Sequence, residues 1–69
     1  MKKVVIRGSM IRLGDLLKFA GLVMTGGEAK LLINNGQVKV NGEVCTQRGK
    51  QLKAGDIVSV NGETIEVSV

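Results

Sequence analysis

The sequence contains no histidine, proline, tryptophan or tyrosine, and it has one cysteine. Histidine is the side chain whose charge changes most readily near neutral pH, and the few carboxylates are scattered over predicted turns and strand ends. We therefore expect no catalytic residues and predict that the protein is not an enzyme. Cys45 alone cannot form an internal disulfide or a cysteine-based metal site, so we expect no metal, no cofactor and a reducing, cytoplasmic location.

Long apolar runs are absent as well. No stretch approaches the roughly 18 consecutive apolar residues that a membrane span needs, so we expect no membrane partner. The 69 residues suffice for one domain, predicted to cover 1–69, whose small core leaves little room for a deep substrate cavity.

Aromatic side chains are almost missing, because Phe19 is the only one. Sheets that bind single-stranded RNA present two or three exposed rings on which bases stack. This chain cannot build such a platform, so any RNA would be recognised through its phosphates and folded shape. Phe19 itself is predicted to lie at the margin of the core.

Acidic residues are few in most of the chain. The net charge is +4. Residues 1–53 hold all ten Lys and Arg and three acidic residues, a formal charge of +7, whereas residues 54–69 hold only three acidic residues, a charge of −3. This asymmetry suits a polyanionic partner; a solvated basic surface is the alternative explanation.

Two helices are predicted from apolar spacing. The first has apolar residues at i, i+3, i+4 and i+7, namely Leu13, Leu16, Leu17 and Ala20. The second begins at Thr25, which has the capping-box spacing to Glu28, and ends at Gly36, which tolerates the left-handed conformation.

Strands and turns account for most of the remaining chain. Alternating or β-branched residues predict strands in segments 2–7, 38–40, 57–60 and 63–69. Asn-Gly pairs at 41–42 and 61–62 predict two tight hairpin turns. The last strand is expected to pair with the first, so the fold class is α+β with two packed helices against a small bent antiparallel sheet.

The order of these elements is similar to a known RNA-binding family. The similarity covers about residues 11–60. The residues of this chain that carry it are Arg12-Leu13, Leu17, Gly21-Leu22, Thr25, Glu28-Ala29-Lys30, Ile33, Gly36, Val38, Val40-Asn41-Gly42 and Gly55-Asp56. This run resembles the ribosomal S-four type RNA-binding domain, also called the αL RNA-binding motif, and in particular its small free-standing bacterial members.

The resemblance implies a cytoplasmic, ribosome-associated protein that binds structured RNA, with ribosomal RNA as the expected partner, without catalysis. The helix pair and the adjoining strand-loop would form the RNA face. Ribosomal proteins are further possible partners, and a monomer is expected. Many family members have Ser-Arg in place of Thr25-Gly26, and several have Lys or Arg in place of Leu31, Asn34 and Gln37, so the charge of the RNA face is expected to be weaker here.

Candidate RNA-binding residues fall into three groups. Arg48 and Lys50, with Lys39 and Lys53, are predicted to form a basic rim, and Arg48 is favoured because a guanidinium grips phosphate with two hydrogen bonds. Lys18 and Lys30 are predicted on the solvent faces of the two helices. The last group is Thr25, Gly26 and Gly27, since a glycine-rich helix start suits phosphate; alternatively, the glycines only shape the turn while Thr25 and Glu28 satisfy its amides.

Other functions compete with this interpretation. The main alternative is a protein-interaction or assembly module whose basic face meets an acidic protein. A β-grasp sulfur carrier has similar length and strand content, but the chain ends Glu66-Val67-Ser68-Val69 in place of the Gly-Gly tail that such a carrier needs.

Overall fold

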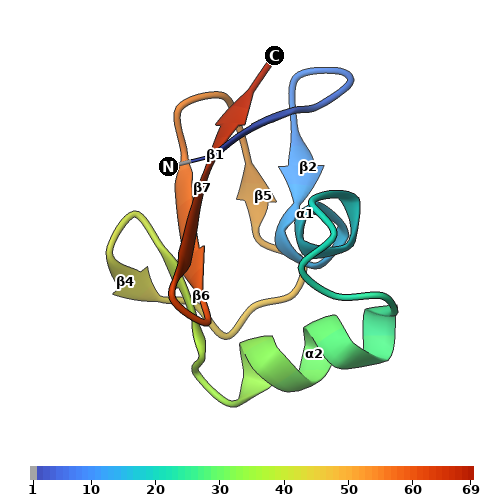
Figure 1. The fold of residues 1–69 in the computed structure, drawn as a ribbon, viewed down its shortest axis with the longest axis vertical. Helices are drawn as coiled ribbons and strands as arrows, with labels where there is room; N and C mark the ends of the chain where they lie inside the picture. The colour runs from blue at the N-terminus through green and yellow to red at the C-terminus, as the bar shows by residue number, and fades with distance from the viewer. Residues whose placement is uncertain (1) are drawn as a thin grey trace.

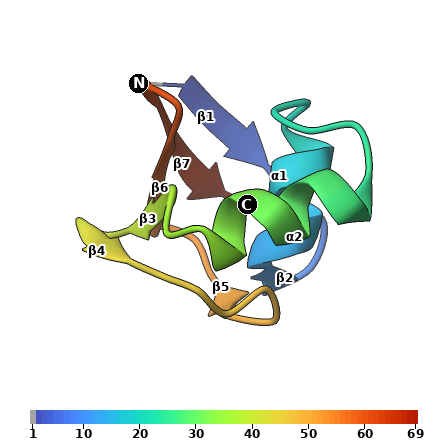
Figure 2. The same cartoon turned by 90° about the horizontal axis from the view of Figure 1, so that it is seen from below.

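In the computed structural model, which describes residues 2–69, two helices pack against one face of a five-stranded sheet (Figures 1 and 2). The helices are α1 (Leu13–Phe19) and α2 (Gly26–Asn34). The strands are β1 (Lys2–Val5), β2 (Ile11–Arg12), β3 (Val38–Val40), β4 (Glu43–Val44), β5 (Gln51–Leu52), β6 (Ile57–Val60) and β7 (Glu63–Ser68). Within residues 2–69, neither helix has the length and apolar character that crossing a membrane requires.

The main sheet has the strand order β1-β7-β6-β3-β4, and β2 and β5 form a separate two-stranded ribbon. The α+β class with two packed helices is confirmed, as is the pairing of the first strand with the last. The prediction of a purely antiparallel sheet is wrong, because this pair is parallel whereas the other pairs are antiparallel, so the sheet is mixed. Hairpin turns impose antiparallel pairing on consecutive strands, but no such turn joins β1 to β7.

Both predicted hairpin turns are present. Asn41 and Gly42 have φ of 52° and 86°, and Asn61 and Gly62 have φ of 51° and 80°. Positive φ at both central positions is the type I′ geometry that matches the twist of the flanking strands. These turns set the β3–β4 and β6–β7 registers, which pair Val40 with Glu43 and Val60 with Glu63.

The core lies between the helices and the sheet. Its fully buried large side chains are Leu13, Leu16, Leu17, Ile33, Val38, Leu52, Val58, Ile65 and Val67. The helical stripe and the strand alternation predicted from the sequence are therefore confirmed. Phe19 differs from the prediction, because its side chain is 58% exposed. It is the last residue of α1, next to the solvent-facing Lys18, and lies at the flank of the apolar stripe.

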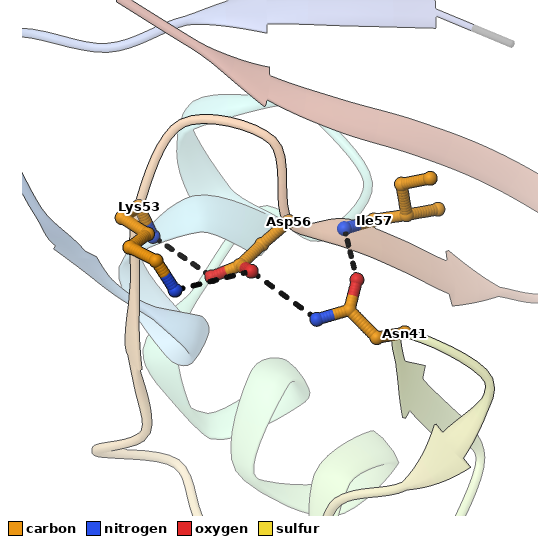
Figure 3. A network of polar contacts seen from close by, with 4 residues as sticks. All are labelled: Asn41, Lys53, Asp56 and Ile57. Atoms are coloured by element: carbon orange, nitrogen blue, oxygen red, sulfur yellow. Dashed lines mark hydrogen bonds and ion pairs between the residues drawn. The ribbon is translucent and has the colours of Figure 1, made fainter.

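A polar network holds the β3–β4 turn against the turn before β6 (Figure 3). The Asn41 side chain donates to Asp56 Oδ1 over 3.2 Å and accepts from the Ile57 N–H over 2.9 Å. Asp56 also accepts from the Lys53 N–H over 2.9 Å. This backbone hydrogen bond, with the Asn41 amide and the charges of Lys53 and Lys50, lowers the pKa of Asp56 below its ordinary 3.8, although burial opposes the shift.

Candidate nucleic-acid interface

A shallow hollow of about 280 Å³ lies where α1, the start of α2 and the loop 45–50 meet. We call it the basic hollow. Its lining residues are Arg12, Gly14, Asp15, Lys18, Gly26, Ala29, Arg48 and Gly49. Three of these are cationic and one is acidic. Figure 2 shows how the chain runs from β4 to β5 beside β2 and so brings the loop to the helix side of the sheet.

The loop is attached to the beginning of α1 by backbone hydrogen bonds. The N–H of Leu13 donates to the carbonyl of Lys50 over 2.8 Å, and the N–H of Gly14 donates to the carbonyl of Arg48 over 3.0 Å. The first amides of a helix have no partner within the helix. Here two of them find acceptors in the loop, so the start of α1 determines where Arg48 lies.

Gly14 allows the loop to approach closely. An ideal Cβ added at Gly14 would lie 2.7 Å from Cγ of Arg48 and 3.6 Å from its carbonyl oxygen. Gly14 and Asp15 were not predicted as site residues, and Arg12 was named only among the residues that carry the family resemblance. A glycine inside an apolar helical pattern often has a packing reason, and this was the available signal.

The start of α2 supplies amide groups. The Thr25 hydroxyl accepts from the Glu28 N–H over 3.2 Å, and the Glu28 carboxylate accepts from the Met24 N–H over 3.2 Å. Neither of these two hydrogen bonds involves the N–H groups of Gly26 and Gly27, which have no acceptor within residues 2–69. Gly26 lines the basic hollow, whereas Gly27 does not.

Other predicted residues lie around or away from this hollow. Lys18 lines it, and its Nζ lies 3.9 Å from Oδ1 of Asp15. Lys30 is exposed on α2 one helical turn beyond Gly26, and it does not line the hollow. Lys50 lines a different hollow, of about 410 Å³, near the β3–β4 turn.

Two predicted lysines have other surroundings. Lys39 is exposed between the buried Val38 and Val40, so its side chain leaves the sheet on the face opposite the core and the helices. Lys53 lies 3.8 Å from the carboxylate of Asp56. The structure thus brings together Lys18, Gly26 and Arg48, with Thr25 and Lys30 beside them, and adds Arg12; it does not bring Lys39 to this site.

The basic hollow has the chemistry of an anion site. Guanidinium groups bind phosphate through paired, charge-assisted hydrogen bonds, and free amides at a helix start carry partial positive charge. Asp15 is the exception, because a carboxylate repels phosphate. Within residues 2–69, no three acidic or cysteine side chains lie close enough to hold a metal ion.

Comparisons with known proteins identify relatives of this chain. A family model described as "S4 domain" matches residues 4–68. The "Probable ribosome maturation protein RlbA" of Bacillus subtilis (strain 168) is 42% identical over 53 residues, which are 77% of this chain and 75% of that protein. The "Putative RNA-binding protein YbcJ" of Escherichia coli (strain K12) is 42% identical over 57 residues, 83% of this chain and 81% of that protein.

A solved structure extends the likeness to the fold. The solution structure of YbcJ from E. coli, described as revealing an αL motif involved in RNA-binding, matches with a TM-score of 0.76 at 36% sequence identity. The match covers 100% of this chain and 89% of that one.

Proposed function

The chain belongs to the S4 domain family, and on this premise we propose that it binds structured RNA without catalysis, by holding backbone phosphates in the basic hollow. The observation that carries the proposal is the convergence of Arg12, Lys18 and Arg48 on one concave surface. Phosphate contacts supply most of the sequence-independent affinity for nucleic acid.

Ribosomal RNA is the partner we propose. One relative is named as a probable ribosome maturation protein and another as a putative RNA-binding protein, which supports this choice. The scarcity of aromatic side chains also favours a folded RNA over an extended single strand, because extended strands are bound mainly by stacking.

A pair of double variants tests the location of the site. Lys18→Glu with Arg48→Glu reverses two charges in the basic hollow, whereas Lys2→Glu with Lys3→Glu makes the same change in total charge on β1. Binding to fluorescently labelled helix-junction fragments of ribosomal RNA would be measured by anisotropy. We expect the first variant to lose at least about tenfold in affinity, and the second much less, since charge-assisted hydrogen bonds depend on position.

Melting temperatures should stay within a few degrees for both variants, because all four side chains are exposed. An equal loss of affinity in both variants would show that net charge alone attracts RNA. If the unmodified protein bound none of these fragments but captured an acidic protein, the RNA function would be wrong and the assembly alternative would replace it.

A further inference from the structure

A second hollow adjoins the basic one. It has a volume of about 320 Å³ and is lined by Met10, Ile11, Arg12, Asp15 and Gln51. Arg12 and Asp15 line both hollows, so they form the wall between them. A ligand bound across this wall would contact the basic hollow on one side and a less basic surface on the other.

The backbone places the polar residues of this second hollow side by side. Arg12 pairs with Gln51 in the β2–β5 ribbon, and paired residues on one face of antiparallel strands have adjacent side chains. Arg12 is also the N-cap residue of α1, and Asp15 follows three residues later in the first turn. The three side chains therefore surround one small area.

The remaining lining is apolar. Met10 is 54% exposed, and Ile11 is half-buried and packs against the core. A flat apolar ligand could lie over these two side chains, and the planar guanidinium of Arg12 could stack on it. The amide of Gln51 and the carboxylate of Asp15 would then meet polar groups at its edge.

We propose that this second hollow binds one unstacked nucleobase of the RNA, and that Asp15 selects guanine over uracil. The inference rests on the proposed function, because the phosphate next to that base would occupy the basic hollow. It explains why a carboxylate lies among the cations of a phosphate site. One base needs one stacking surface, which Arg12 and Met10 can supply without an aromatic platform.

The selectivity follows from donor and acceptor patterns. An ionised carboxylate only accepts hydrogen bonds. Guanine presents two neighbouring N–H donors on its pairing edge and a carbonyl oxygen to which the Gln51 amide could donate. Uracil presents one N–H between two carbonyl oxygens, which a carboxylate repels. The ion pair with Lys18 does not prevent this, because at 3.9 Å and with both side chains largely exposed it is weak.

Four RNA hairpins that differ only in one bulged nucleotide, G, A, C or U, provide the test. We expect the unmodified protein to bind the G bulge about tenfold more tightly than the U bulge, within the range for a two-bond base contact. Asp15→Asn should reduce this ratio below about twofold without lowering affinity for the U bulge, because a repulsive charge is removed. Gln51→Ala, which alters no charge, should reduce the ratio in part.

Glu63→Gln is the matched control, since it removes the same charge at the exposed β6–β7 hairpin, and it should keep the full ratio. Melting temperatures of all variants would confirm folding. Equal binding of the four bulges, or a G preference that survives Asp15→Asn, would overturn the base site while leaving phosphate binding intact. If the unmodified protein bound none of the four hairpins, both this proposal and the proposed function would be overturned.

Discussion

At the scale of single residues, Gly14 shapes the basic hollow and Asp56 holds two turns together elsewhere in the fold. Gly14 carries no side chain where the loop with Arg48 comes closest to α1. Asp56 connects the β3–β4 turn to the turn before β6 through Asn41 and the backbone of Lys53. Substitution of each residue is expected to change the stability of the protein for a different reason.

Gly14→Ala should destabilise the protein by about 1 kcal/mol. The added methyl group would lie 2.7 Å from Cγ of Arg48, and such crowding costs about 1–3 kcal/mol, while the better helix propensity of alanine offsets up to about 1 kcal/mol. Urea unfolding measures the change. Gly27→Ala is the control: its nearest contact would be 3.8 Å from Thr25 Oγ1, so it should stabilise by about 0.4–1 kcal/mol. If both variants changed the free energy of unfolding in the same direction, crowding at Gly14 would not be the cause.

Asp56→Asn should cost about 1–3 kcal/mol at pH 7, because hydrogen bonds to a charged group are lost. Whichever carboxylate oxygen the new amide N–H₂ replaces, it would face a donor, either the Asn41 side chain or the Lys53 N–H. The pKa of Asp56 is lower in the folded state than its ordinary 3.8. The ionised carboxylate therefore stabilises the fold above about pH 4, and this contribution is lost as the pH falls through the folded-state pKa.

Urea unfolding at pH 7 and pH 3 measures this dependence. The unmodified protein should lose more stability than Asp56→Asn between the two pH values. Glu63→Gln removes a charge at an exposed position and should change stability by less than about 0.5 kcal/mol. An equal acid sensitivity of the unmodified protein and Asp56→Asn would show that other carboxylates dominate.

At the scale of elements, α2 depends on the capping at its two ends. At its end, the N–H of Gln37 donates to the carbonyl of Leu32 and that of Gly36 donates to Ile33, which together form a Schellman motif. Gly36 has a φ of 75°, as this motif requires. At its start, the Thr25 hydroxyl holds one amide and leaves those of the glycines free for a ligand.

Thr25→Ala should destabilise the protein by about 0.5–2 kcal/mol, because the Glu28 amide loses its acceptor. Thr25→Ser keeps the hydroxyl and should lose much less. Chemical unfolding followed by far-ultraviolet circular dichroism compares the two variants. Equal losses would mean that the methyl group of Thr25, and not its hydrogen bond, matters.

At the scale of the whole molecule, the fold separates the cations that the sequence only counts. Arg12, Lys18 and Arg48 line one hollow, while Lys39 lies on the opposite face of the sheet. Lys53 lies beside Asp56, where its charge supports the fold. Three of the ten Lys and Arg residues therefore line the basic hollow, and the net charge of +4 does not show where they lie.

RNA binding should consequently weaken steeply with salt. Each phosphate that a cation neutralises contributes about −0.7 to −0.9 to the slope of log affinity against log salt concentration, so three cations predict a slope of about −2 or steeper. Titrations between about 50 and 200 mM salt measure it. A flat response would exclude the phosphate mechanism. The Lys18 and Arg48 double variant should show a shallower slope than the unmodified protein.

Some of the residues of the candidate site could be predicted from the sequence, and others could not. Arg48, Lys18 and Gly26 were identified from residue type and family resemblance, and they line the basic hollow. Arg12, Gly14 and Asp15 were missed as site residues, because their role depends on where the loop 45–50 docks. The one local signal is Gly14 inside the apolar helical pattern, and it does not say which segment packs there.

The sequence alone determined both helices, the four longer strands and the two Asn-Gly turns, because apolar spacing, the Thr25 cap and turn chemistry act over a few residues. The short strands β2, β4 and β5 were not predicted. Only the tertiary structure decided that β1 joins β7 in parallel and that the loop 45–50 lies against α1. Both depend on backbone groups that lie far apart in the chain, so no local pattern of residues specifies which groups pair. The second of these pairings, between the loop and the start of α1, forms one side of the hollow where RNA is proposed to bind.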